Sequence, residues 1–188
     1  MLVNTRKPKI VYVLRVLLPI ACLGMLFFIF HNSLKTGEES SVQSASVTAV
    51  AQEIVRAVAP ESKWATATGE EYEIFHAFVR DFAHGLEFAL LGALFCWCYF
   101  AYTLSAKYVY LPISGVLAVP IFDEWLQTFS AGRASSLSDV MTDTFGGMIG
   151  LVFALVTVLI GATVYALKQK KRKKESEDGK RELGNCLN

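Results

Sequence analysis

Charged side chains interrupt an otherwise apolar segment near the middle of this 188-residue sequence. Arg80, His84 and Glu87 stand at positions i, i+4 and i+7, so they share one face of a helix. Asp81 lies beside that face. A guanidinium, an imidazole and carboxylates grouped in this way are able to hold an anion, move a proton or help to bind a cation. The segment therefore predicts one wall of a polar site.

Two further segments carry acidic side chains at helical spacing. Asp123 and Gln127 are one turn apart, and so are Asp139 and Asp143. A charged side chain deep in a bilayer costs at least about 2.5–3.5 kcal/mol, so such residues normally face a bundle interior or a wet cavity. We therefore expect the three segments to meet in one cavity. Its predicted lining residues are Arg80, Asp81, His84, Glu87, Asp123, Glu124, Gln127, Arg133, Asp139 and Asp143.

Four uses fit these residue types. In a purely structural network, Arg80 and Arg133 would neutralise the acids and fix the packing of the helices. A metal site would combine His84 with carboxylates, whereas an enzyme would use His84 or Glu87 as a general base near an anion held by the arginines. A binding cavity would hold a lipid headgroup or a peptide carboxylate. Because six acids face only two arginines and one histidine, we favour binding or chemistry over a purely structural network.

The predicted cavity belongs to a membrane protein. A spanning helix needs about 20 mostly apolar residues, and 53% of this chain is hydrophobic. The sequence predicts an all-α polytopic fold with four transmembrane helices in one domain, residues 1–167. Gly146 and Gly150 form a small-x-x-x-small face for close helix contact. The predicted spans are residues 10–30, 82–104, 108–129 and 140–167.

The segments outside these spans have distinct compositions. Residues 31–75 are polar, but apolar side chains at helical spacing between Val47 and Val58 predict a short amphipathic helix on the outer surface. The helix of the second span is expected to begin at about Glu70. Residues 168–188 are charged and predict a disordered cytoplasmic tail.

The basic residues predict the orientation. Lys and Arg concentrate on the cytoplasmic side of membrane proteins, and here they cluster before the first span and after the last. An even number of spans places both termini on one side, so we expect both in the cytoplasm and the polar cavity at the outer face. The net charge of only +1 indicates no nucleic-acid partner. The expected partners are the lipid bilayer and, in one alternative, a second copy of the chain.

Three stretches resemble the VanZ-like family of bacterial membrane proteins. Residues 32–41 (NSLKTGEESS) are similar to a polar Gly-Glu-Glu-Ser motif, and residues 80–88 (RDFAHGLEF) to an Arg-Lys-x-x-His-x-x-Glu-Tyr motif. Asp81 stands where the motif usually has Lys, and Phe88 where it has Tyr, so a role for that Lys does not carry over. Residues 123–146 resemble a block of Asp-Glu-x-x-Gln, Gly-Arg and Asp-x-x-x-Asp-x-x-Gly.

The resemblance implies a protein of the bacterial cytoplasmic membrane with a role in the cell envelope, because the family is named after a member linked to low-level resistance to teicoplanin. It implies no defined reaction. The sequence contains no nucleophile elbow, P-loop or dinucleotide fingerprint, and we predict no cofactor.

Three functions remain open. The leading hypothesis is binding or handling of an amphiphilic molecule at the outer leaflet, such as a glycopeptide, a lipid-linked envelope precursor or a phospholipid. The alternatives are an enzyme acting on a lipid or lipid-linked substrate and a small homodimeric transporter. The first is favoured because the unusual polar residues converge on the predicted outer side.

Overall fold

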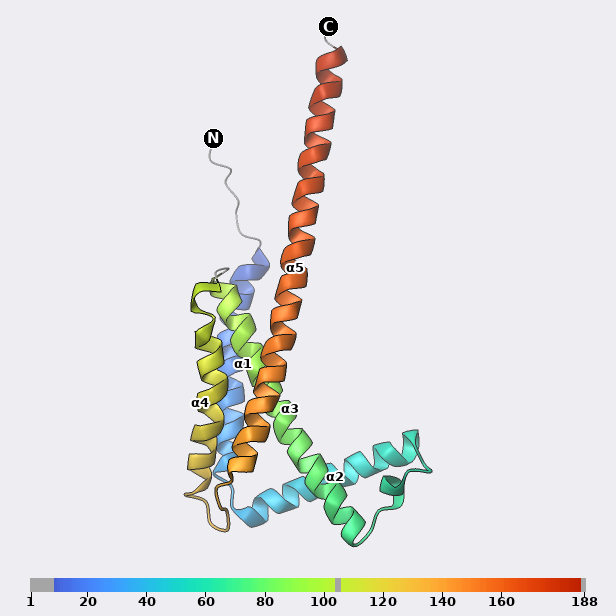
Figure 1. The fold of residues 1–188 in the computed structure, drawn as a ribbon, viewed down its shortest axis with the longest axis vertical. Helices are drawn as coiled ribbons and strands as arrows, with labels where there is room; N and C mark the ends of the chain where they lie inside the picture. The colour runs from blue at the N-terminus through green and yellow to red at the C-terminus, as the bar shows by residue number, and fades with distance from the viewer. Residues whose placement is uncertain (1–8, 104–105, 187–188) are drawn as a thin grey trace.

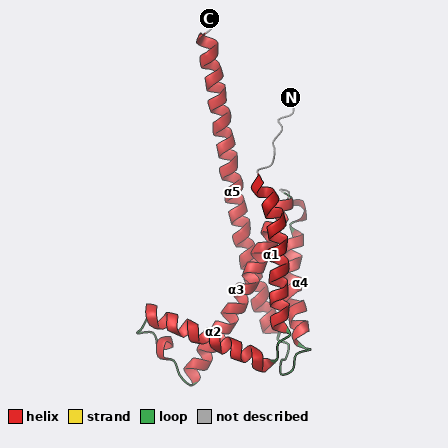
Figure 2. Ribbon diagram, turned by 180° about the vertical axis from the view of Figure 1, so that it is seen from behind, coloured by secondary structure: helices red, strands yellow, loops and turns green. Residues whose placement is uncertain are grey.

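The computed structural model describes residues 9–103 and 106–186, and all regular structure within them is helical (Figure 1). The elements in chain order are α1 (Lys9–Ser33), α2 (Gly37–Val58), the 3-10 helix η1 (Lys63–Thr66), α3 (Glu70–Tyr102), the 3-10 helix η2 (Ala106–Tyr108), α4 (Tyr110–Gln127) and α5 (Leu137–Cys186). Helices α1, α3, α4 and α5 form a bundle, and α2 lies across one end of it. The view from behind (Figure 2) shows the same arrangement, with the beginning of α1 and the end of α5 at the opposite end from α2.

Three of these helices are long and apolar enough to cross a membrane. They are Ile10–Ser33 in α1, Glu70–Tyr102 in α3 and Leu137–Glu175 in α5. Large apolar side chains on the outer surface of the bundle, such as Phe27 (73% exposed) and Phe145 (69% exposed), are suited to contact with lipid. Helix α4 coincides with the predicted third span. It has only 18 residues, and the acidic Asp123 and Glu124 in its last turns reduce its apolar character.

Glycine residues allow α3 and α5 to approach each other closely. A Cβ atom on Gly146 would overlap the backbone of Gly85, and one on Gly150 would overlap the backbone of Ala89. Small residues at helix interfaces permit such close backbone contact in membranes. The predicted role of Gly146 and Gly150 is therefore confirmed, and their partner is α3.

Helix α2 is longer than the short amphipathic helix predicted from the sequence, because it begins at Gly37 and has 22 residues. A capping box sets this start. The Glu39 backbone N–H donates to Thr36 Oγ1 at 3.2 Å, and the Thr36 backbone N–H donates to Glu39 Oε2 at 2.9 Å. The second hydrogen bond lowers the pKa of Glu39 below its usual value. The helix ends at Val58, just before Pro60, as predicted.

The C-terminal tail differs from the prediction of disorder, because α5 continues as a helix to Cys186. The tail is rich in Lys, Glu and Arg, which have high helix propensity. Lys171 Nζ lies 3.8 Å from the Glu175 carboxylate, one helical turn further on. Such i, i+4 pairs support an exposed helix. High charge therefore did not prevent helix formation here.

The glycine contact between α3 and α5 generates a stability prediction. Gly150→Ala should destabilise the protein by about 1–3 kcal/mol, because the added methyl group has no space beside the Ala89 backbone. The measurement is the apparent unfolding temperature of the purified protein in detergent. Gly161→Ala is the matched control on the same helix, since no atom lies within 4 Å of its added Cβ. Equal unfolding temperatures for the two variants would contradict the prediction.

Candidate ligand-binding cavity

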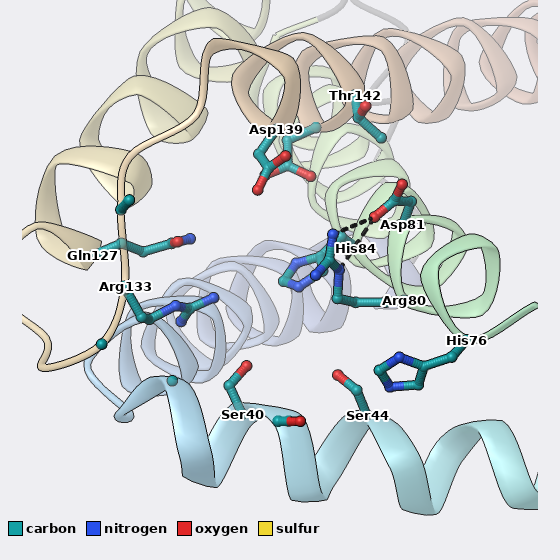
Figure 3. Close-up of a pocket in the computed structure, with 15 residues that line it drawn as sticks. Ser40, Ser44, His76, Arg80, Asp81, His84, Gln127, Arg133, Asp139 and Thr142 are labelled. Atoms are coloured by element: carbon teal, nitrogen blue, oxygen red, sulfur yellow. Dashed lines mark hydrogen bonds and ion pairs between the residues drawn. The ribbon is translucent and has the colours of Figure 1, made fainter. Parts of the chain in front are cut away.

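A polar cavity lies between α2 and the end of the bundle that α2 crosses (Figure 3). Its volume is about 240 Å³. In the close-up, side chains from α2, α3, the first turns of α5 and the loop after α4 surround one common space. The lining residues are Gly37, Ser40, Ser41, Ser44, His76, Arg80, Asp81, His84, Gln127, Gly132, Arg133, Ala134, Asp139, Thr142 and Asp143.

A second, smaller cavity of about 60 Å³ adjoins the first, because Ser40, Ser44, Arg80, His84 and Arg133 line both. Its remaining lining residues are Asn32, Gln43, Val47, Val79, Ala83 and Glu87. The adjoining space thus adds three small apolar side chains and one carboxylate to the shared polar wall.

The structure distributes the ten predicted site residues unevenly. Seven of them line the larger cavity, namely Arg80, Asp81, His84, Gln127, Arg133, Asp139 and Asp143. Glu87 lines only the smaller one, one turn along α3 from His84. Asp123 and Glu124 line neither of these two cavities, and both are buried in the protein.

Asp123 ties the end of α1 to the end of α4. The Ser33 hydroxyl donates a hydrogen bond to Asp123 Oδ1, and the Gln127 side-chain amide donates to Oδ2 at 3.1 Å. The Ser130 hydroxyl in turn donates to the Ser33 carbonyl oxygen at 3.0 Å. Since Asp123 is 1% exposed and both its oxygens accept a hydrogen bond, its role in this structure is to hold the helices together.

Glu124 holds the loop that follows α4. Its Oε1 atom accepts a hydrogen bond from the Ser136 backbone N–H at 2.5 Å. The same loop is bound to the start of α2, because the Gly37 N–H donates to the Ala131 carbonyl at 3.0 Å. Gly132 permits this close approach, since its φ of 75° lies in the left-handed region that favours glycine. These contacts place Arg133 at the cavity.

Among the described residues, some charged side chains of the cavity walls form an ion pair and others do not. Arg80 forms an ion pair with Asp81 at 3.2 Å, and both side chains are about half exposed. Arg133 donates one hydrogen bond, to the Asn32 carbonyl at 3.3 Å. Within residues 9–103 and 106–186, neither Arg133 nor the carboxylates of Asp139 and Asp143 form an ion pair. Charges of both signs are therefore available to a ligand.

Several cavity residues are absent from the set predicted from sequence. Ser40, Ser41 and Ser44 extend from α2, and Thr142 from α5. His76 also lines the cavity, although its sequence position suggested only a polar surface residue. It precedes Arg80 by four residues, so extending the Arg80–His84 face back by one turn would have identified it. Ser40 and Ser41 lie in the stretch that resembles the Gly-Glu-Glu-Ser motif, but their residue type gave no signal for a cavity, because hydroxyl residues are common in caps and polar segments.

Metal binding finds no ready-made site in the part of the chain that the structure describes. There, no three His, Cys, Asp or Glu side chains are grouped closely enough to hold a metal ion. His84 instead lies near charges of both signs, which come from the acidic side chains of Asp123 and Asp139 and the basic side chains of Arg80 and Arg133.

Comparison with known proteins gives one match. The model of the family described as VanZ/LLP1 matches residues 16–166. These include all residues that line the cavity, α1 from Val16 onward, the whole of α3 and α4, and α5 as far as Ala166. Neither the curated proteins nor the solved structures contain a match to this chain.

The hydrogen bonds of Asp123 generate a prediction about stability. Asp123→Ala should lower the apparent unfolding temperature, because it leaves the buried Gln127 amide without this acceptor, at about 1–3 kcal/mol. It also removes the hydrogen bond from Ser33 that joins α1 to α4, and the Ser33 hydroxyl keeps only the Ile29 carbonyl of its own helix as acceptor, at 3.0 Å. Asp81→Ala is the control, since its exposed ion pair contributes at most about 1 kcal/mol. Thermal unfolding in detergent distinguishes the two. If Asp81→Ala proves the more damaging, Asp123 does not have this structural role.

Proposed function

The chain belongs to the VanZ/LLP1 family, and from that premise we propose that it is a cell-envelope protein. In this proposal the protein binds the polar group of an amphiphilic molecule in the cavity between α2 and the end of the bundle. The observation that supports this most directly is the cavity itself. A space of about 240 Å³ is lined by charged and hydroxyl side chains from three helices and one loop. The membrane-spanning helices supply an adjacent surface suited to apolar chains.

The size of the cavity limits what it encloses. Pockets for drug-sized ligands measure about 300–1,000 Å³, so a cavity of about 240 Å³ is suited to a small polar group. A headgroup fits this description, and an entire glycopeptide does not. We therefore propose that any effect on teicoplanin susceptibility arises through an envelope molecule that the protein binds, and not through enclosure of the antibiotic.

For the topology we propose four spans, with α4 as the third, in the bacterial cytoplasmic membrane. Near the end of α4, Asp123 and Gln127 form a hydrogen bond with each other inside the bundle, and Oε1 of Glu124 accepts one from the Ser136 backbone, although its buried Oε2 has no partner among the described residues. Polar side chains that face the bundle interior in this way permit a short helix to cross. Both termini would then lie in the cytoplasm. The Lys and Arg side chains within positions 1–15 and 168–174 favour this orientation. The cavity would face outward, where envelope precursors and glycopeptides are found.

Cysteine labelling tests this orientation. In a variant that lacks the four native cysteines, Ser135→Cys in the exposed loop beside the cavity should react with a membrane-impermeant maleimide in intact cells. Lys170→Cys, on α5 just after the predicted end of the fourth span, is the matched control and should react only after permeabilisation. The reverse pattern would overturn the proposed topology.

Substitution of Arg133 tests the cavity's role. Expression of the protein in a susceptible bacterium should raise the inhibitory concentration of teicoplanin, and Arg133→Gln should return it to the value of the empty vector. Arg56→Gln is the matched control, because Arg56 also donates one hydrogen bond to a backbone carbonyl, at 3.0 Å to Ala65, but lies outside both cavities. Membrane levels of each variant are measured by immunoblot. Full protection by Arg133→Gln at normal abundance would contradict the proposal.

A further inference from the structure

The two walls of the larger cavity differ in charge. The side formed by α2, α3 and the loop after α4 presents serine hydroxyl groups, two histidines, Arg133, which has no ion pair among the described residues, and the Arg80–Asp81 ion pair, whose charges offset each other. The side formed by α5 presents Asp139, Thr142 and Asp143. Figure 3 shows Asp139 on one side of the space, with Arg133 and the two labelled serines, Ser40 and Ser44, on other sides of it. The cavity is therefore complementary to a group that carries both charges.

The basic side is suited to a phosphate. Arg133 donates one hydrogen bond to the Asn32 carbonyl, and a guanidinium has five N–H donors in total. The hydroxyl groups of Ser40 and Ser44 are one helical turn apart on α2 and face the same space (Figure 3). Nε2 of His76 is buried and has no hydrogen-bond partner among the described residues. Donors from three directions match a tetrahedral anion with several acceptor oxygens better than a planar carboxylate.

The acidic side is suited to an ammonium group. Asp143 is 3% exposed, yet its carboxylate has no hydrogen bond or ion pair with another described residue. Asp139 lies one turn earlier on the same face of α5 and is equally without a partner for its carboxylate in that part of the chain. Asp143 is buried, and a buried carboxylate without a partner is costly, whereas Asp139 is exposed. A cation with N–H donors placed between the two would satisfy Asp143 and also pair with Asp139.

We propose that the bound group is a phospholipid headgroup that carries a phosphodiester and a primary ammonium, with the phosphate at Arg133 and the serines of α2 and the ammonium at Asp139 and Asp143. This inference rests on the proposed function and specifies its ligand. The adjoining smaller cavity supports a lipid as the source, because three of the six residues that it adds to the shared polar wall are apolar, namely Val47, Val79 and Ala83, beside the polar Asn32, Gln43 and Glu87. An attached glycerol and the first methylenes of its chains fit such a lining.

Native mass spectrometry of the purified full-length chain tests the headgroup. The probes are phosphatidylethanolamine, phosphatidylglycerol and phosphatidylcholine with identical acyl chains. The wild-type protein should bind phosphatidylethanolamine about tenfold more tightly than phosphatidylglycerol, which corresponds to about 1.4 kcal/mol. Phosphatidylcholine should also bind more weakly, because its quaternary ammonium has no N–H donor.

Variants separate the two walls. Asp139→Asn should remove the preference for phosphatidylethanolamine while leaving phosphatidylglycerol binding intact, and Asp143→Asn is a second variant with the same expected effect. Arg133→Gln should weaken binding of both lipids. Glu53→Gln is the control, because Glu53 is exposed on α2 and lines neither cavity.

The outcomes distinguish the inference from the function on which it rests. Saturable binding of all three lipids with equal affinity, or an unchanged preference in both Asp139→Asn and Asp143→Asn, overturns the headgroup assignment and leaves the proposed function standing. Absence of saturable binding to any lipid contradicts both. Soluble glycerophosphoethanolamine is the final arm, and binding as tight as that of the lipid would overturn the assignment to a membrane lipid.

Discussion

The site depends on the close contact between α3 and α5. Gly146 lets the backbone of α5 approach the backbone of α3 at Gly85, and a side chain on Gly146 would force the two helices apart. His84 immediately precedes Gly85, and Asp143 lies about one turn before Gly146. Because the helices touch at this point, side chains from both reach one cavity of about 240 Å³. The close helix contact that requires Gly146 thus also brings His84 of α3 and Asp143 of α5 to the same cavity.

Carboxylates of two kinds stand at this end of the bundle. Both oxygens of Asp123 accept hydrogen bonds from protein groups, and Glu124 accepts one from the loop backbone. Asp139 and Asp143 line the cavity and form no ion pair within the described residues. Asp139 is exposed, but Asp143 is buried, and proteins rarely leave a buried carboxylate unpaired unless a site requires it. Residues with identical side chains therefore divide into those that maintain the fold and those that are available to a ligand.

Helical spacing alone was sufficient to group Arg80 with His84 and to place the start of α3 at Glu70, because both follow from local geometry. It could not separate Asp123 from Asp139, since each has a polar residue one turn away. The difference arises when the loop after α4 folds back onto the end of α1, a contact between residues about one hundred positions apart. The serines of α2 were missed for the same reason. The helical spacing of Ser40 and Ser44 indicates a shared cavity wall only once α2 is known to cross the end of the bundle.

The separation of opposite charges in the cavity is itself a property of the fold. Flexible side chains of opposite sign would tend to pair, but each wall here is held by contacts elsewhere. Arg133 is fixed to the Asn32 carbonyl, and its loop is bound to Gly37. Asp139 lies in the first turn of α5, whose position is set by its contact with α3. Because this arrangement exists before a ligand arrives, a group that bridges the two walls loses little entropy in ordering them. Preorganised charges of both signs therefore favour a compact zwitterion over a ligand of a single charge.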